Sequence, residues 1–149
     1  MASRRNFLLT ALLLLAGAPF ASAQAAPQPA PPAGKIEINY HRCDGKYDRW
    51  GVHLWKSPNM PLPDIEWPNP MMPTGKNDFG VYWQVDEQEF STGAKMQVNY
   101  IIHKGDIKEQ GAKDMAFDGL QHKAIWVING DRTIYFSREE ALKDHVCKK

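Results

Sequence analysis

Apolar and polar residues alternate along much of the chain after residue 34. In the first alternating stretch Ile36 and Ile38 fall on one side of an extended strand, as expected when one face of a sheet is buried. The same alternation places Val52 and Leu54 on one side of a second strand. Further β-branched and aromatic runs occur at residues 79–85, 95–103, 123–128 and 132–136. This density of short strands predicts an all-β fold, specifically an antiparallel β-sandwich.

Turn and loop signals separate these runs. The segment Asn129-Gly130-Asp131 predicts a tight hairpin turn between the last two strands. Residues 58–73 contain six prolines, which predicts a long irregular loop because proline cannot donate to the hydrogen-bond ladder of a sheet. Residues 137–140, Ser-Arg-Glu-Glu, match a capping box, so a short C-terminal helix is expected.

The first 23 residues have the order of a secretory signal peptide. A positive start at Arg4 and Arg5 precedes a mostly apolar run, and the small residues Ala21-Ser22-Ala23 follow as a cleavage site. Residues 3–9 also resemble the twin-arginine export motif except at the last position, so an ordinary secretory signal and the twin-arginine route both stay open. Either route predicts cleavage after Ala23 and export to the periplasm or the medium.

The exported chain is expected to hold one domain behind a linker. Residues 24–34 are rich in proline and alanine and lack apolar periodicity, which is typical of an extended linker. Residues 35–137 have a suitable length for a single sandwich domain, and residues 138–149 would form a C-terminal helical tail.

Charge and hydropathy narrow the classes of partner. Removing Arg4 and Arg5 with the signal would leave 16 of the 18 basic residues against 17 acidic ones, a net charge of −1. Without a clustered excess of basic residues, no nucleic-acid partner is expected. No second apolar run reaches the ~20 residues of a membrane-spanning helix, so no membrane partner is expected either. We expect a soluble monomer.

The chain has two cysteines, Cys43 and Cys147, at opposite ends of the expected domain. In an oxidising compartment such an even pair predicts a disulfide. Closing so long a loop would stabilise the fold by about 4–5 kcal/mol on the chain-entropy account. Two unpaired thiols are the alternative, and redox catalysis is not expected because the chain has no Cys-x-x-Cys motif.

The sequence lacks the usual patterns of catalytic and metal sites. Glycoside hydrolysis needs two carboxylates across a cleft, whereas the candidate aspartates stand in turn-like contexts, where they usually bond their own backbone: Asp44, Asp48, Asp78, Asp106 and Asp114. The five histidines show no close ligand spacing such as His-x-x-x-His, so neither a metal nor another cofactor is expected. No Gly-x-Ser-x-Gly nucleophile motif is present. These features point away from an enzyme.

The aromatic residues are the strongest candidates for binding. Trp83 and Trp126 lie within apolar strands and are expected in the core, whereas Trp50 follows a polar turn, where a buried ring is less expected. His53 and Trp55 share a strand face that is either a second core layer or an exposed platform. An exposed ring can cover the C–H face of a sugar while polar neighbours bond its hydroxyls.

Four motifs follow one another along the chain: His-Arg-Cys-Asp-Gly-Lys-Tyr-Asp-Arg-Trp-Gly-Val-His-Leu-Trp at 41–55, Gly-Lys-Asn-Asp-Phe-Gly at 75–80, Ile-Ile-His-Lys-Gly-Asp at 101–106 and Ile-Trp-Val-Ile-Asn-Gly-Asp at 125–131. In order and spacing they resemble the motifs of the pullulanase-associated domain, which is carbohydrate-binding module family forty-one. Together they cover nearly the whole expected domain.

The resemblance implies an immunoglobulin-like β-sandwich that binds α-glucans such as starch, glycogen, pullulan or maltooligosaccharides without hydrolysing them. By position, Trp50 matches the main stacking tryptophan of the family. Lys108 and Asp114 match the lysine and aspartate that bond sugar hydroxyls. His53 matches a position where some members place another aromatic contact, and Trp55 shares its strand face.

Members of this family are usually attached to pullulanases, whereas no catalytic barrel follows the module in this sequence. We therefore expect either a free-standing exported binding protein or a binding protein that works beside a separately encoded amylolytic enzyme. A rival hypothesis is an exported structural or inhibitory protein that uses the sandwich to bind a protein partner, because a fold alone does not fix a function.

Overall fold

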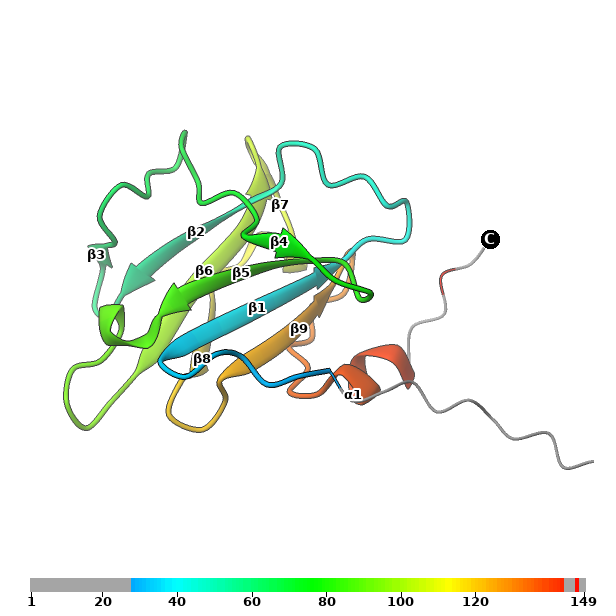
Figure 1. Ribbon diagram of the computed structural model, residues 1–149. Coiled ribbons are helices and arrows are strands. Elements are labelled where there is room, and N and C mark those ends of the chain that lie inside the picture. The colour runs from blue at the N-terminus through cyan, green and yellow to red at the C-terminus, as the bar shows by residue number, and fades with distance from the viewer. Residues whose placement is uncertain (1–27, 144–146, 148–149) are drawn as a thin grey trace, which may run out of the picture.

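The computed structural model describes residues 28–143 and Cys147, which form two β-sheets packed face to face (Figure 1). The expected β-sandwich is therefore confirmed. The expected signal peptide and most of the expected C-terminal tail beyond residue 143 lie outside the described residues.

The first sheet has the strand order β4-β5-β1-β9. Its strands are β1 (Lys35–His41), β4 (Gly75–Lys76), β5 (Val81–Asp86) and β9 (Ala124–Ile128). Strand β1 runs antiparallel to β5 but parallel to β9, so one pairing departs from the all-antiparallel expectation. In this register Ile38 lies between Trp83 and Ile125, and all three side chains are fully buried.

The second sheet has the order β3-β2-β6-β7, and β8 also pairs with β6. Its strands are β2 (Gly51–Lys56), β3 (Met60–Pro61), β6 (Gln97–Lys104), β7 (Ile107–Lys108) and β8 (Met115–Asp118). Two short 3-10 helices, η1 (Glu87–Glu89) and η2 (Gln110–Ala112), join the strands.

The alternation in the sequence sets the core between the sheets. Ile36 and Ile38 from β1 pack with Val52 and Leu54 from β2 in one cluster, and all four are completely buried. The side chains between them point to the outer faces, since successive residues of a strand point to opposite sides.

The run at residues 132–136 is not a strand, so the prediction of a terminal hairpin is wrong. Only one bridge forms, between Trp126 and Tyr135. The Asp131 carboxylate accepts hydrogen bonds from the Thr133 N–H at 2.9 Å and the Tyr135 hydroxyl at 2.7 Å. These local bonds turn the backbone away from a regular ladder along β9.

The capping box at residue 137 does begin a helix, α1 (Arg138–Lys143). The Ser137 hydroxyl accepts the Glu140 N–H at 3.1 Å, which satisfies one of the free donors of the first turn. With six residues, this α-helix of the described region is far too short to cross a membrane.

The segment expected to be a linker contacts the first sheet. The Gln28 side-chain amide donates to Asn39 at 2.9 Å and to Glu37 at 3.3 Å, and its oxygen accepts the Trp126 indole N–H at 3.3 Å. Contacts to the sandwich therefore begin before Lys35, because Gln28 supplies partners to the buried polar residues Glu37 and Asn39.

A buried carboxylate, that of Glu109 between β7 and η2, ties three parts of the chain together. It accepts the Tyr40 hydroxyl at 2.6 Å and the Arg42 guanidinium at 3.0 Å from the end of β1. It also accepts the Asn129 side-chain amide at 2.8 Å and the Gly130 N–H at 3.1 Å from the turn after β9. Every oxygen of this carboxylate therefore has a donor, as burial requires.

Burial and charge around this carboxylate shift the pKa values of the neighbouring groups in the expected directions. Burial raises the pKa of Tyr40, and the adjacent Glu109 carboxylate raises it further. Arg42 also holds Asp44 through two hydrogen bonds, at 3.0 and 2.9 Å, and lowers the pKa of that exposed carboxyl to about 2. At neutral pH the Tyr40 hydroxyl therefore keeps the proton that it donates to Glu109, and the Asp44 carboxylate stays paired with Arg42.

We expect Glu109→Ala to lower the free energy of unfolding by about 3 kcal/mol, near the low end for breaking a buried ion pair, because Arg42 would keep Asp44. Denaturant unfolding measures this loss. Asp48→Ala is the control, since the Asp48 side chain is 81% exposed and forms only surface ion pairs, with Arg49 at 3.3 Å and with Lys104 at 3.9 Å, and the change should leave stability almost unchanged. Equal stability of the two variants would contradict the assigned role of Glu109.

Candidate functional site

The outer face of the second sheet carries the aromatic strand residues. The register of β2 on β6 places His53 opposite Ile101 and Trp55 opposite Asn99. Because Val52 and Leu54 fill the core, His53 and Trp55 point away from it, and both remain partly exposed. Of the two alternatives left open by the sequence, a second core layer or an accessible face, the structure has the accessible face.

An open groove of about 310 Å³ lies on this face. Residues from strands β2, β3, β6 and β7 and from three loops line it: His53, Trp55, Asn59, Pro61, Trp67, Ile101, Lys108 and Asp114. Four of the five sequence-predicted contacts are thus brought together, namely His53, Trp55, Lys108 and Asp114. Trp67 was not predicted, because it lies in the proline-rich loop, where no strand alternation indicates where a side chain points.

Trp67 is held on the sheet by ring stacking. Its indole lies parallel to the His103 imidazole, with ring centroids 3.9 Å apart and 7° between the planes. His103 is completely buried, and its Nδ1 is 2.9 Å from the Gly105 carbonyl oxygen, to which it donates. The Lys108 ammonium lies 4.9 Å from the Trp67 ring centroid, within cation–π range. A loop residue thus gains a fixed place beside the strand residues of the groove.

The backbone of the proline-rich loop is also fixed. Val52 and Met71 exchange two backbone hydrogen bonds, at 2.9 and 3.0 Å, and the Trp83 indole donates to the Met71 carbonyl at 2.8 Å. The loop approaches so closely that a Cβ on Gly51 would lie 2.7 Å from the Pro70 side chain. Glycine at position 51 therefore lets the loop pack against β2.

Trp50 does not line the groove. Its side chain is only 5% exposed and belongs to the core cluster, with the Arg42 guanidinium 4.5 Å above its ring and Tyr40 at 5.8 Å. The expectation of an exposed Trp50 platform is therefore wrong. Trp50 lies two residues before Val52 and four before Leu54, so in an extended chain its side chain points to the same side of the sheet as theirs. Arg49, with a φ of 59°, ends the turn, so the extended alternation already applies at Trp50.

A larger hollow of about 530 Å³ lies near the Met96 end of β6. Its only aromatic lining residue is Phe117, which is 6% exposed, so this hollow offers no accessible ring face among the described residues. The groove beside Trp55 and Trp67 is therefore the better candidate for a ligand that stacks on aromatic rings.

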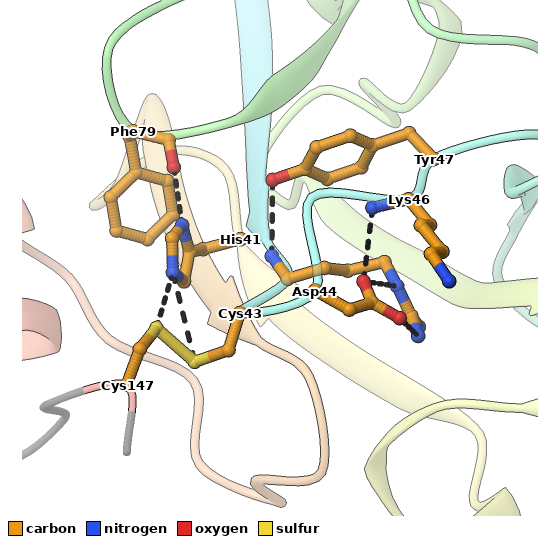
Figure 2. Close-up of a disulfide and its surroundings, with 8 residues drawn as sticks. His41, Cys43, Asp44, Lys46, Tyr47, Phe79 and Cys147 are labelled. Carbon is orange, nitrogen blue, oxygen red and sulfur yellow. Dashed lines mark hydrogen bonds and ion pairs between the residues drawn. A yellow bond between two sulfur atoms is a disulfide. The ribbon is translucent and has the colours of Figure 1, made fainter. Parts of the chain in front are cut away.

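The expected disulfide joins Cys43, just after β1, to Cys147 near the C-terminus, with the two Cα atoms 5.3 Å apart (Figure 2). The alternative of two unpaired thiols is wrong for this structure. The bond closes a loop of 104 residues and so restricts the unfolded chain strongly.

Comparison with known proteins agrees with this architecture. A family model described as "Bacterial pullanase-associated domain" matches residues 34–136. The chain belongs to this family. The matched segment contains every strand of the sandwich and every residue of the groove.

Relatives of this pullulanase-associated domain are much longer proteins. An α-amylase of Streptomyces lividans is 32% identical over 81 residues, or 54% of this chain. Pullulanase A of Streptococcus pneumoniae is 26% identical over 109 residues, or 70% of this chain. Each match spans 8% of the relative's own length.

A solved structure described as "Alpha-glucan recognition by family 41 carbohydrate-binding modules from streptococcal virulence factors" shares 28% identity and a TM-score of 0.60. The match covers 74% of this chain and 50% of that one. A Klebsiella pneumoniae pullulanase complexed with maltotriose has a TM-score of 0.62 over 80% of this chain and 12% of that one. Its 21% identity supports the likeness of fold alone.

The groove lowers the proton affinity of His53. Burial lowers the pKa of His53 below its usual 6.5, the nearby His103 lowers it further, and Asp114 opposes both effects. As the pH falls through about 6.5, the unfolded chain therefore takes up this proton before the folded one does. The contribution of neutral His53 to stability is present at higher pH and is lost on acidification.

A titration of the His53 ring protons by NMR should therefore give a pKa below 6.5. Asp114→Asn removes the opposing charge and should lower this pKa further, which a merely structural change in the loop would not predict. A His53 pKa at or above 6.5, or one that rises in Asp114→Asn, would contradict this description of the groove.

Proposed function

We propose that this domain binds α-glucan chains in the groove formed by Trp55, Trp67, Lys108 and Asp114. The single observation that carries the proposal is the convergence of two tryptophans, a lysine and a carboxylate in one open groove. Tryptophan rings can cover the C–H faces of glucose units, while charged and amide groups can bond their hydroxyls. Membership of the family and the relatives described as α-glucan-binding modules support the same ligand class.

Binding without hydrolysis is part of this proposal. Cleavage of a glycosidic bond requires two carboxyl groups, about 5 Å apart for retention or 6.5–9.5 Å for inversion. Among the residues that line the groove, Asp114 is the one carboxylate. A lone carboxylate can accept hydrogen bonds from hydroxyls but lacks the partner for acid–base chemistry.

We further infer a role outside the cytoplasm, beside an amylolytic enzyme. The disulfide fits an oxidising compartment, and the relatives include an α-amylase and a pullulanase. A binding domain that holds the polysaccharide raises the local concentration of substrate for such an enzyme. A monomer is sufficient for this role, since one chain contains the whole groove.

Affinity electrophoresis tests the function directly. Glycogen, amylopectin or pullulan in the gel should retard the folded, disulfide-bonded protein, whereas a soluble cellulose derivative should not. Migration unchanged by every α-glucan would refute the proposed function. A release of reducing sugar from pullulan by the purified chain would refute the non-catalytic assignment alone.

Alanine variants distinguish the tryptophans of the groove from the other tryptophans. Stacking of a ring on a flat ligand contributes about 1–3 kcal/mol, by analogy with base stacking, so Trp55→Ala and Trp67→Ala should each weaken binding about 5- to 150-fold. Isothermal titration with a maltooligosaccharide measures this. Trp126→Ala is the matched control, because Trp126 is a partly buried tryptophan on the other sheet. While that variant remains folded, its affinity should equal that of the wild type, and a loss as large as for Trp67→Ala would contradict the site.

A further inference from the structure

The imidazole of His41, the last residue of β1, lies between a backbone carbonyl and the disulfide (Figure 2). Its Nδ1 is 2.6 Å from the Phe79 carbonyl oxygen. Its Nε2 is 3.1 Å from Cys147 Sγ and 3.9 Å from Cys43 Sγ. The ring also packs against the Phe79 ring, with centroids 5.4 Å apart. Two independent contacts therefore fix the direction in which Nε2 points.

The carbonyl contact decides which ring nitrogen carries the proton. A carbonyl oxygen can only accept a hydrogen bond, so Nδ1 is the donor. In the neutral imidazole Nε2 then holds a lone pair. The disulfide sulfurs have no hydrogen to donate to it. Three atoms with lone pairs, His41 Nε2 and the two sulfurs, thus lie within 4.8 Å of one another.

We propose that, when the disulfide is reduced, His41, Cys43 and Cys147 form a zinc-binding site. Two thiolates and one imidazole are a common ligand set for Zn²⁺, and a water molecule would complete a four-coordinate shell. The site is open enough for metal entry, because Cys43 is exposed and His41 and Cys147 are partly exposed. The residues of the glucan groove take no part, so this proposal stands independently of the proposed function.

The distances suit this metal. Zinc bonds of about 2.3 Å to sulfur and about 2.0 Å to nitrogen imply N···S separations of about 3.5 Å in a tetrahedron. The observed separations of 3.1 and 3.9 Å lie on either side of that value. Once the S–S bond is broken, the sulfurs need to move apart to about 3.8 Å. The hydrogen bond from Nδ1 to Phe79 is the kind of outer contact that orients histidine ligands of metals.

The redox step balances with a dithiol as reductant. The dithiol passes two electrons and two protons to the disulfide and is itself oxidised to a disulfide, while the Cys43–Cys147 bond breaks to give two thiols. Zn²⁺ then replaces both thiol protons, which pass to solvent. In the reverse direction a small-molecule disulfide is the oxidant: it takes two electrons from the two thiolates and two protons from solvent and becomes two thiols, while the Cys43–Cys147 bond forms again and Zn²⁺ is released. Disulfide and zinc site are therefore mutually exclusive states of the same three residues.

Zinc binding to reduced and oxidised protein tests the proposal. The reduced protein, freed of reductant under anaerobic conditions, should take up one more equivalent of Zn²⁺ than the oxidised protein in competition with a chromophoric chelator. Co²⁺ in place of Zn²⁺ should give thiolate-to-cobalt charge-transfer absorption in the reduced protein alone. No additional zinc on reduction would overturn the proposal.

His41→Asn isolates the imidazole ligand, since its amide N–H can still donate toward Phe79 while Nε2 is lost. Zinc affinity of the reduced variant should fall at least about tenfold. His122→Asn is the control, because His122 stacks on Phe136 instead of the cysteines, and it should bind zinc as the wild type does. If the reduced chain bound zinc through its cysteines alone, folded or unfolded, affinity would not depend on His41, and that result would refute the proposal.

Discussion

The buried carboxylate of Glu109 is the constraint on which the arrangement of the loops depends. It joins the end of β1, the turn after β9 and the segment that follows β7. A buried charge without donors would be very costly, so these three segments must stay together while the protein is folded. Lys108 directly precedes Glu109, and this anchor therefore also fixes the strand that carries the lysine of the groove.

The same network accounts for the place of Trp50. Arg42 bonds Glu109 through one nitrogen and Asp44 through two others. Held in this way, its guanidinium covers the Trp50 ring and closes that end of the core. A tryptophan beneath a fixed arginine is not available to a sugar. The accessible tryptophans, Trp55 and Trp67, line the groove on the outside of the second sheet, where we propose that the glucan binds.

The aromatic rings and the lysine of the groove share rigid support. His53 and Trp55 stand on a central strand, Trp67 is stacked on a buried histidine, and β7 holds Lys108. A groove whose rings are already in place avoids most of the entropy cost of ordering them when a ligand binds. A low ordering cost in the protein favours binding of the proposed ligand, because a flexible polysaccharide itself loses conformational entropy when it binds.

Strand alternation was sufficient to predict the sandwich, its core positions and the placement of His53 and Trp55 on the strand face opposite Val52 and Leu54, but not whether that face is accessible. Trp50 lies two residues before Val52, so the same alternation indicates a buried ring. The polar turn that precedes Trp50 indicates an exposed one instead, and the prediction followed the turn. The position of Trp67 could not be read from the sequence, because it depends on contact with His103 far along the chain. The run at residues 132–136 has strand-like composition, yet side-chain bonds from Asp131 prevent a ladder. Lys108 and Asp114 were found through family resemblance, since their loop alone resembles any solvated turn.

The central claim is that the glucan lies on Trp55 and Trp67 and not on Trp50. An NMR titration with a maltooligosaccharide, following the indole N–H signals of the assigned tryptophans, tests it most directly. The signals of Trp55 and Trp67 should shift progressively and saturate together, while those of Trp50 and Trp83 stay in place. A saturating shift of the Trp50 signal, with Trp55 and Trp67 unaffected, would contradict the account.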